Sequence, residues 1–375
     1  MQLNPSYYTH GLISRQLFEV YFLLGLRTLT IAMIGIFLPL YLLNEVALPF
    51  ASVVTFFLIM AATFGLALFP AATIISRFGS KHAILLSYPF LGTGLLVTLA
   101  LQSRPDLRAL AALAFGINMA LFWMGFHIDA ALYSKKKVIG KQLALMHITE
   151  TFGVVLGPLT GGLIVKYFGF TVLFIIAFII LAISIIPILF SKEVYAKTEF
   201  DIRYFFKDGH TKYFFGYLAQ GVQFTTLGVM WPIFIFSILG GYLSLGIYGT
   251  IVALIVAILG YVIGNIADDY RKGKIIKIAA VADGILWIFR PFVSSVQQLF
   301  AVGIIGGTTR SAIDIPLLAK TYNRARREQI ATFILFREIS LRMGEVTVLI
   351  LVLVFANMKV AFIASTLSAL LYFLF

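Results

Sequence analysis

The stretch of sequence that decides the fold runs from Asp129 to Gly169 and reads DAALYSKKKVIGKQLALMHITETFGVVLGPLTGGLIVKYFG. An acid ends one apolar segment, a short basic loop follows, and a second acid, Glu150, lies early in the next apolar segment. The interior of that second segment then carries several glycines and a proline. Ionisable groups within lipid cost free energy, so apolar segments carry them for function or for specific packing.

Each part of this stretch has a physical reason in a membrane helix. The lysines at 135–137 and 141 resist translocation and mark the cytoplasmic side. Glycines spaced by four between 153 and 161 leave a groove without side chains, which a neighbouring helix can approach closely. Pro158 removes a backbone hydrogen bond and bends the helix. A bend beside a groove suits a helix that changes its contacts, and the alternative is ordinary close packing.

The composition classifies the chain before any motif is considered. Hydrophobic residues make up 61% and charged residues only 12%, and the mean hydropathy is +0.99. A soluble domain carries about a quarter charged residues, so we predict an all-α integral membrane protein. A spanning helix needs about 20 apolar residues, and the sequence predicts twelve. The predicted spans are 17–44, 50–75, 83–101, 109–133, 143–165, 171–190, 213–239, 242–267, 275–293, 299–318, 330–355 and 360–375.

Several functional classes are excluded by what the sequence lacks. It contains no cysteine, which excludes disulfides and thiolate metal sites. His147 and Glu150 have metal-ligand spacing, but no second such pair accompanies them in neighbouring spans. There is no phosphate-binding glycine loop of the Walker type and no legible set of nucleophile, base and acid. We therefore predict no cofactor, no metal and no enzymatic activity, and residues 1–14 predict no signal peptide.

Lysine and arginine residues alternate in number from loop to loop. One set of alternate loops, with the N-terminal segment, holds 20 of them, and the other set holds 5. Because positive residues stay on the cytoplasmic side, this bias predicts a multi-pass protein of the cell membrane, inner or plasma, with both termini cytoplasmic. It also explains the net charge of +13 as topology and attraction to anionic lipid, so no nucleic-acid partner is predicted.

The glycines and the proline of the fifth span form a pattern with a known counterpart. The pattern consists of Gly153, Gly157, Pro158, Gly161 and Gly162, followed by Gly169, Phe170 and Phe174. It resembles the helix 5 motif of the major facilitator superfamily, often called the antiporter motif. The family pattern has a further glycine where this sequence has Ala144. The resemblance identifies no subfamily; it implies a secondary transporter of two six-helix bundles in a 6+6 pseudo-repeat and favours export by antiport.

The longest connection between predicted spans divides the chain in two. Residues 191–212 are mixed in charge and follow the sixth span. They are predicted to form a cytoplasmic linker between an N-terminal six-helix bundle, residues 1–190, and a C-terminal six-helix bundle, residues 213–375. The two halves also repeat an arrangement of acids across a basic loop, which consists of Asp129 and Glu150 in the first half and Asp314 and Glu338 in the second.

Corresponding loops of the two halves resemble the loop 2-3 signature of the same superfamily, which has glycine, acid, base, glycine and base. The matching residues are Arg77, Gly79 and Lys81 after the second span, and Gly264 and Asp268 after the eighth. The first copy has Ser76 in place of the acid. The resemblance implies that Asp129 pairs with Lys81 or Arg77 when the cytoplasmic side is closed. Asp314 is the looser counterpart in the second half.

Arg27 and Glu150 are charged residues deep within predicted spans. Arg27 has no acid one helical turn away, and Glu150 has His147 one turn from it. At a rise of about 1.5 Å per residue, the two charges lie about 12 to 15 Å from the inner ends of their helices. Two interpretations stay open. Arg27 holds an anionic group of a solute while Glu150 or His147 carries a coupling proton, or Arg27 and Glu150 form a permanent structural pair.

The second half carries charged and polar residues that can partner one another. Arg310 and Asp314 are one turn apart, and Arg342 is one turn from both Glu338 and Glu345. These groups either line a solute cavity or only hold helices together. A polar stripe on the seventh span has the same two interpretations, and we favour solute binding there; Asp283 has no assigned role. The candidate solute or coupling residues are Arg27, His147, Glu150, Tyr217, Gln220, Gln223, Arg310, Asp314 and Glu338.

The function that these features favour is secondary active transport of a small solute by alternating access. Coupling to protons is predicted because carboxylates and a histidine lie within spans. The predicted partners are a small-molecule solute, protons and membrane lipids, and the protein is predicted to be a monomer. The alternatives are an importer or uniporter of the same fold, and a transporter-like receptor or assembly factor that moves no solute. Arg27 favours an anionic solute, whereas an aromatic content of 15% suits hydrophobic compounds equally.

Overall fold

The chain is helical throughout the part that the structure describes. The computed structural model describes residues 15–133, 139–189, 202–207, 209–269 and 272–375. The side chains at 15–20, 131–133, 139–148, 187, 202, 206, 261–269 and 272 fall outside the description. The described residues form helices and turns without any strand, which confirms the predicted all-α fold. Seven of the described helices are long and apolar enough to cross a membrane.

The first half of the chain begins with a helix in three pieces. These are α2 (Arg15–Gly35), α3 (Leu38–Leu40) and the π-turn η1 (Tyr41–Glu45). The elements that follow are α4 (Phe50–Phe78), α5 (Ser80–Ala100), η2 (Pro105–Leu107), α6 (Arg108–Tyr133), α7 (Ile139–Ser184) and α8 (Ile186–Leu189). α7 consists of two helices that meet at Gly169, whose φ of 79° and ψ of 174° are not helical. The glycine thus separates the predicted spans 143–165 and 171–190.

The second half also begins with a broken helix. Each break has a π-turn close to a proline: η1 follows Pro39 in the first half, and a π-turn precedes Pro232 in the second. A proline has no N–H to donate, so it disturbs the hydrogen-bond ladder of the helix there. The elements of this half are η3 (Ile202–Phe206), α9 (Thr211–Thr225), η4 (Thr226–Met230), α10 (Trp231–Leu239), α11 (Tyr242–Asp269), α12 (Lys272–Phe289), η5 (Arg290–Phe292), α13 (Val296–Arg327), α14 (Ile330–Phe355), α15 (Lys359–Ala369) and η6 (Leu370–Leu374). Each predicted span falls on one of these helices or on a run of them.

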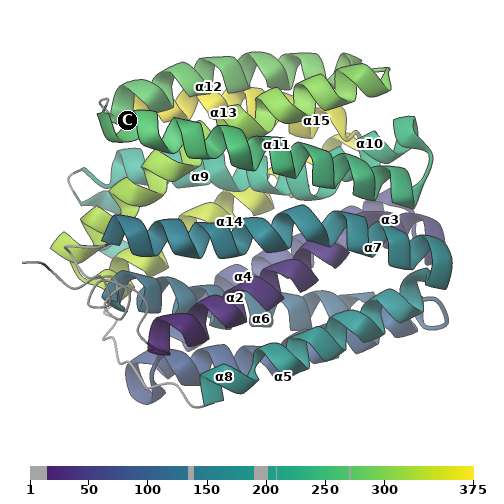
Figure 1. The fold of residues 1–375 in the computed structure, drawn as a ribbon, viewed down its shortest axis with the longest axis horizontal. Helices are drawn as coiled ribbons and strands as arrows, with labels where there is room; N and C mark the ends of the chain where they lie inside the picture. The colour runs from purple at the N-terminus through teal and green to yellow at the C-terminus, as the bar shows by residue number, and fades with distance from the viewer. Residues whose placement is uncertain (1–14, 134–138, 190–201, 208, 270–271) are drawn as a thin grey trace, which may run out of the picture.

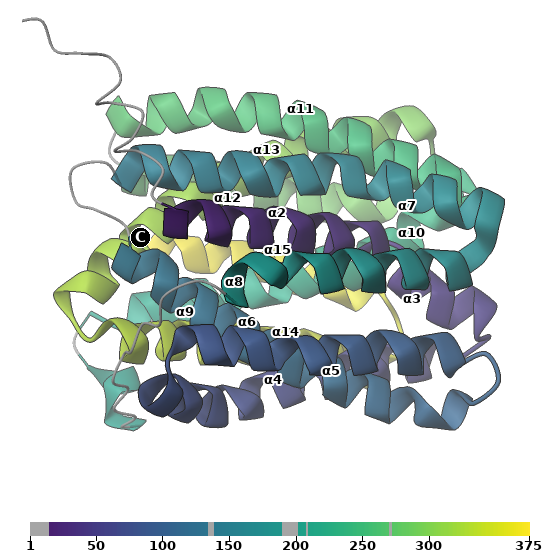
Figure 2. The ribbon, with the colours of Figure 1, turned by 60° about the horizontal axis from the view of Figure 1, so that its bottom comes forward.

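The helices run side by side along the long axis of the molecule (Figure 1). Helices of the first half, purple to teal, occupy the lower part of this view, and the green to yellow helices of the second half occupy the upper part. The start of α2 and the C-terminus lie at the same end of the bundle in both views (Figure 1 and Figure 2). The sequence predicts that this end is cytoplasmic, so it is referred to below as the predicted cytoplasmic end.

Glycines bring α7 into backbone contact with α2. A β-carbon at Gly153 would lie 2.6 Å from the backbone nitrogen of Leu29, and one at Gly157 would lie 2.5 Å from the β-carbon of Ala32. Gly161 faces α2 in the same way. The groove that the glycine spacing predicts is thus confirmed, and α2 is the helix that fills it.

The second half repeats this close contact between α9 and α14. A β-carbon at Gly221 would overlap the carbonyl oxygen of Leu341, and one at Gly344 would overlap the carbonyl oxygen of Leu218. Each helix therefore supplies one glycine against the backbone of the other. Since α9 and α14 carry the first and fifth predicted spans of their half, the two halves pack corresponding helices in the same manner.

The two most extensive helix contacts between the halves are those of α7 with α11 and of α4 with α14. A buried apolar cluster at the second junction combines Phe64, Leu68 and Ile75 of α4 with Ile334 and Leu335 of α14. The two halves are therefore packed against each other along two seams. The bounds of the two bundles and of the linker given above stay a prediction.

Candidate functional site

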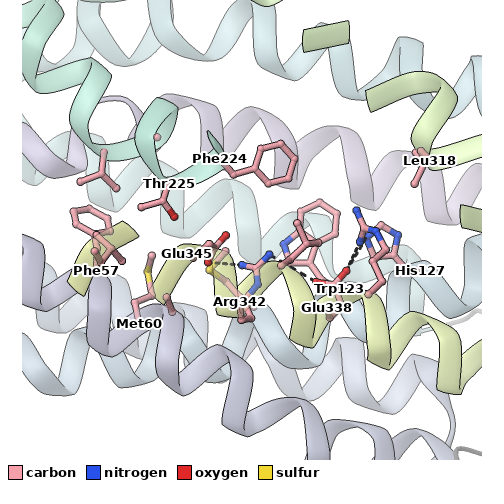
Figure 3. Close-up of a pocket in the computed structure, with 17 residues that line it drawn as sticks. Phe57, Met60, Trp123, His127, Phe224, Thr225, Leu318, Glu338, Arg342 and Glu345 are labelled. Carbon is pink, nitrogen blue, oxygen red and sulfur yellow. Dashed lines mark hydrogen bonds and ion pairs between the residues drawn. The ribbon is translucent and has the colours of Figure 1, made fainter. Parts of the chain in front are cut away.

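Two cavities lie between the halves of the chain. The larger, about 410 Å³, is lined by α4 and α6 of the first half and by α9, η4, α13 and α14 of the second. It is referred to as the α14 cavity, and its wall includes Phe57, Trp123, His127, Glu338, Arg342 and Glu345 (Figure 3). The smaller, about 360 Å³, is referred to as the α2 cavity; α2, α6, α7, α11 and α13 line it through residues that include Arg27, Trp123 and Glu150. Trp123 lines both cavities.

Charged side chains of α14 run along the α14 cavity (Figure 3). Arg337 donates to Glu338, and Arg342 donates to Glu345 over 2.8 Å. Nη2 of Arg342 lies 3.8 Å from Oε2 of Glu338. The pairings of Arg342 predicted from helical spacing are therefore confirmed. All four residues are buried, and two positive charges face two negative ones, so the network is formally neutral.

His127 of α6 connects this network to the first half of the chain. Its Nε2 lies 3.1 Å from Nη1 of Arg337 and 3.7 Å from Oε1 of Glu338. Its Nδ1 lies 2.8 Å from the hydroxyl oxygen of Tyr322 on α13. The ring also stacks on Trp123, with ring centres 5.4 Å apart. His127 is thus a point at which a first-half helix contacts both α13 and α14.

Arg27 lies in the wall of the α2 cavity and is only 3% exposed. Its Nη2 donates to Oδ1 of Asn118 on α6 over 2.9 Å, and its guanidinium lies 3.6 Å from the centre of the Phe122 ring. None of the ion pairs between described side chains involves Arg27, and its buried Nη1 has no hydrogen-bond partner. A buried cation with an unused donor beside a cavity is suited to hold an anionic group.

Glu150 of α7 lies in the wall of the same cavity as Arg27. The depth predicted for the two residues thus brings them to one site. The predicted ion pair is not the contact that the structure describes for Arg27, because its guanidinium packs on Phe122 and donates to Asn118 instead. Much of the remaining wall is apolar, with Val154 and Val256 among its members. The cavity therefore offers one basic and one acidic group in apolar surroundings.

The bend at Pro158 is bridged by a side chain from the other half. The Thr250 hydroxyl of α11 accepts from the backbone N–H of Leu159 over 3.1 Å and donates to the carbonyl of Val155 over 2.7 Å. An unbent helix would join that N–H and carbonyl directly. The neighbouring Gly162 and Gly246 allow α7 and α11 to approach closely. The glycine-proline motif thus serves two contacts, one with α2 and one between the halves.

Tyr242 joins the halves at the end of the bundle that the sequence predicts to be extracellular. Its hydroxyl donates to Oε1 of Glu45 over 2.7 Å. Its ring contacts the rings of Phe37 and Phe170 from the first half and of Phe236 from the second. Together with the Thr250 bridge, this cluster holds the halves together at that end.

Asp129 accepts a hydrogen bond from the hydroxyl of Ser80 over 2.5 Å. Lys81 donates to a backbone carbonyl at the end of α8, and Arg77 is exposed. The pairing of Asp129 with Lys81 or Arg77 that the resemblance implies for the closed cytoplasmic side stays a prediction. Gly79, with a φ of 92°, turns the chain so that Ser80 begins α5 against α6, and Lys81 lies about 100° further round the helix.

Gln220, Gln223, Arg310 and Asp314 form a separate network inside the second half. Nε of Arg310 donates to Oδ2 of Asp314 over 2.7 Å, as the spacing predicts, and Gln220 donates to Oδ1 of Asp314 over 2.8 Å. Nη1 of Arg310 donates to Gln223 and to the hydroxyl of Tyr372. Neither cavity described above is lined by these residues. In this structure they make hydrogen bonds between helices, which is one of the two interpretations of the polar stripe.

Tyr217 and Asp283 are two further buried polar residues in the second half of the chain. The hydroxyl of Tyr217 lies 2.7 Å from that of Thr321, which is another contact between α9 and α13. Asp283 accepts from the indole N–H of Trp287 over 3.1 Å and from the hydroxyl of Thr309 over 3.3 Å. Asp283 therefore has partners on α12 and α13, which its position in the sequence did not indicate.

Glu328 ties the segment before the seventh predicted span to the end of α13. Burial opposes its ionisation, but hydrogen bonds from Tyr204 and His210 and the charge of Arg324 hold the pKa of Glu328 below its usual range. Burial and the same hydrogen bond raise the pKa of the Tyr204 hydroxyl. Because the Glu328 carboxylate is stabilised in its ionised form, this contact is kept above the lowered pKa and is lost as the pH falls through it.

Two groups of residues remain: predicted site residues whose side chains the structure does not describe, and residues of the site that the sequence analysis did not name. The first group consists of His147, Gly264 and Asp268. The second group consists of Asn118, Trp123, His127, Tyr322 and Arg337. Two of these carried a signal in the sequence, because His127 and Arg337 are titratable or charged residues inside predicted spans. Asn118, Trp123 and Tyr322 carried none, since polar and aromatic residues are common at helix contacts in membranes.

The apolar helices and the cavities between two packed halves define the class of this protein, a multi-pass α-helical membrane protein. A family model described as Major Facilitator Superfamily matches residues 20–207, half of the chain. The chain belongs to the Major Facilitator Superfamily, and it is a transporter rather than an enzyme. A search of curated protein sequences returns no significant match.

Solved structures of transporters resemble the fold over nearly the whole chain. A POT family transporter in complex with a thioalcohol conjugated peptide matches with a TM-score of 0.74 at 12% identity, over 96% of this chain and 94% of that chain. A POT family transporter in complex with 5-aminolevulinic acid matches with a TM-score of 0.72 at 12% identity and the same coverage. The human organic anion transporter MFSD10 (TETRAN) matches with a TM-score of 0.68 at 15% identity, over 99% of this chain and 100% of that chain.

Proposed function

We propose that this protein is a secondary active transporter that exports a small solute across the cell membrane by alternating access, in exchange for protons. The observation that carries the proposal is the pair of cavities between the halves, each walled by helices of both and each containing buried charged groups. Transporters of this kind expose one site to each side in turn by rocking one bundle against the other. The bundles are residues 1–190 and 213–375, joined by a cytoplasmic linker at 191–212, and the protein acts as a monomer with cytoplasmic termini.

The solute site is the α2 cavity, where Arg27 holds an anionic group of the solute. The unpartnered Nη1 of Arg27 and the apolar wall around it support this assignment. Glu150 in the same wall carries the coupling proton. Exchange requires that solute and proton compete for one group, and a cationic group on the solute supplies that competition at Glu150. The proposed solute is therefore a small molecule with an acidic and a basic group, and export rests on the glycine-proline pattern of α7.

Proton movement in proteoliposomes tests this proposal. Purified protein in vesicles with a pH dye is screened against short peptides, amino acids such as 5-aminolevulinic acid, organic anions, sugars and lipophilic cations. A solute of the proposed class is expected to trigger proton flux, and Glu150→Gln is expected to reduce that flux at least about tenfold while exchange of labelled solute continues. Asp106→Asn, an exposed acid-to-amide control, should change nothing. An unchanged pH dependence in folded Glu150→Gln contradicts the role of Glu150, and no flux with any solute contradicts coupled transport.

Replacement of Arg27 by methionine is expected to weaken binding of acidic solutes by about 10- to 100-fold, since a hydrogen bond to a charged group contributes about 1.5 to 3 kcal/mol. The variant should still fold, because removing a buried cation that has no ionic partner among the described side chains offsets the lost hydrogen bond to Asn118. The measurement is the solute concentration at half-maximal transport, for a solute and its methyl ester. If the variant loses affinity for the acid and the ester equally, Arg27 does not bind the anionic group.

A further inference from the structure

His127 is a buried titratable group at the junction of the halves, and the proposed solute site does not use it. It lies on α6 in the wall of the α14 cavity and is 8% exposed. Its two ring nitrogens contact Tyr322 of α13 and Arg337 of α14. Histidine changes charge within the physiological pH range. A proton at this position therefore acts directly on a contact between the halves.

The partners of His127 fix its protonation state in this structure. An arginine guanidinium donates at every nitrogen and never accepts. Because Nη1 of Arg337 lies 3.1 Å from Nε2 of His127, that ring nitrogen must be the acceptor and carry no proton. The proton of the neutral imidazole is then on Nδ1, which donates to the hydroxyl oxygen of Tyr322 over 2.8 Å. The arrangement that joins the halves thus contains a neutral His127.

A second proton on His127 must go to Nε2, where the new N–H would point at Nη1 of Arg337, which is itself a donor. Two positive charges would then lie 3.1 Å apart, on His127 and Arg337. The nearest acceptor is Oε1 of Glu338, 3.7 Å from Nε2, but Arg337 and Arg342 already share that carboxylate. The buried network of two arginines and two glutamates would carry one excess positive charge. Protonation therefore breaks one contact between the halves and disfavours the arrangement that buries it.

We propose that His127 is a second proton-binding site, separate from the site at Arg27 and Glu150, and that its protonation opens the contact of α6 with α14. In the neutral form, His127 accepts from Arg337 and holds α6 against α14. In the protonated form it releases Arg337, and the halves separate at the α14 cavity. The consequence for transport rests on the proposed alternating access, whereas the proton site itself can be tested without any solute.

The charged and titratable groups that face His127 from α13 and α14 are Tyr322, Arg337, Glu338 and Arg342. Arg326 of α13 and Glu150 of α7 act on its partner Tyr322. Glu345 is a further titratable group of the cavity, but its carboxylate accepts from Arg342 on its own helix. Protonation of Glu345 therefore changes a contact within α14 and not one between the halves.

Trp123 is a built-in probe of the His127 charge. Its indole stacks on the imidazole, and a protonated imidazole quenches an adjacent indole much more strongly than the neutral ring does. We expect tryptophan emission of the purified protein in nanodiscs to fall as the pH is lowered below about 6.5, because burial and the charge of Arg337 oppose a second charge on His127. His127→Gln should abolish this transition, because glutamine can accept from Arg337 and donate to Tyr322 but binds no proton. Trp123→Phe should remove it, whereas Glu150→Gln and Glu345→Gln should keep it.

Arg337→Gln provides a second variant in case His127→Gln does not fold. The change removes the positive charge beside Nε2 and offers an amide oxygen as acceptor in its place. The midpoint of the Trp123 transition is therefore expected to move up by about one pH unit. A midpoint that stays unchanged or moves down would overturn the assignment of His127.

A single cysteine reports whether protonation opens the junction, since the natural sequence has none. Ala331 is 1% exposed and packs in the cluster between α4 and α14, so Ala331→Cys places a thiol between the halves. Maleimide labelling is expected to rise at least about threefold between pH 7.5 and pH 5 relative to the same cysteine in His127→Gln. The comparison at equal pH cancels the intrinsic pH dependence of the thiol reaction.

The outcomes separate this inference from the proposed function. A transition and a labelling change that are both lost in His127→Gln support the inference, whether or not a transported solute has been found. A transition that follows Glu150 or Glu345 instead overturns it and leaves proton coupling intact. A transition at His127 without a labelling change overturns the proposed opening. Absence of proton flux with every solute would contradict the proposed function alone.

Discussion

Replacing Glu338 with glutamine is expected to lower the free energy of unfolding by about 3 to 5 kcal/mol, the cost of leaving buried charges without a partner. Glu338 is 2% exposed, accepts from Arg337 and lies 3.8 Å from Arg342. Without its charge, Arg337 loses its carboxylate partner, and Arg342 keeps only Glu345. The measurement is equilibrium unfolding of the purified protein in mixed micelles with increasing sodium dodecyl sulfate.

A double variant separates loss of charge balance from loss of packing. Glu338→Gln combined with Arg337→Gln restores one positive charge against one negative, so more than half of the lost stability should return. Asp106→Asn breaks an exposed pair with Arg104 and should produce no measurable change. If Glu338→Gln alone stays within about 1 kcal/mol of the wild type, the network does not stabilise the fold.

Replacing Gly221 with alanine is expected to prevent stable packing of α9 on α14. The added β-carbon would overlap the carbonyl oxygen of Leu341, and this is backbone that cannot rotate away. The helices must then separate along their whole contact, which also opens the reciprocal contact at Gly344. We expect a loss of more than about 3 kcal/mol, above the usual range for overpacking. Yield of monodisperse protein and thermal melting in detergent are the measurements.

Gly35→Ala is the matched control for this prediction. A β-carbon at Gly35 meets nothing within 4 Å. Alanine has a higher helix propensity than glycine, so this change should be neutral or slightly stabilising. Equal melting temperatures for Gly221→Ala and the wild type would show that α9 and α14 do not approach as closely as described.

α14 and α7 carry corresponding spans of the two halves, yet they are used differently. Both pack closely on the first helix of their half through glycine. α7 adds the bend at Pro158, which Thr250 bridges across the halves. α14 instead adds a buried charge network, which His127 bridges across the halves. The two seams between the halves therefore differ in chemistry, because one contains a hydroxyl that does not titrate and the other a histidine that does.

The parts of the fold that were predictable depend on local sequence. Runs of about 20 apolar residues place spanning helices because each backbone group must be paired within its own segment in lipid. The glycine spacing from 153 to 161 defines a groove on one helix face, and the pairs of Arg342 with Glu338 and Glu345 follow from helical periodicity. Each of these features involves residues within about one or two turns of each other.

Predictions about which helix faces which were only partly met. The depths of Arg27 and Glu150 placed both in one cavity, but depth does not fix the direction in which a side chain points around its helix. Arg27 turns to Asn118, and Asp129 accepts from the hydroxyl of Ser80. A rotation of about 100° between neighbouring residues decides such contacts. Helical periodicity gives these angles within one helix and leaves the rotation of one helix against another open.

The sequence by itself determined that this protein is an all-α membrane transporter of the Major Facilitator Superfamily, where its spanning helices lie to within several residues, and which face of α7 carries the groove formed by its glycines. Only the tertiary structure decided that Arg27 faces Asn118, that Thr250 bridges the bend at Pro158, and that His127 meets Tyr322 and Arg337. These partners lie 91 to 210 residues apart along the chain. Their contacts depend on how whole helices pack and rotate against each other, and that arrangement is set by the combined packing of many side chains rather than by any local stretch.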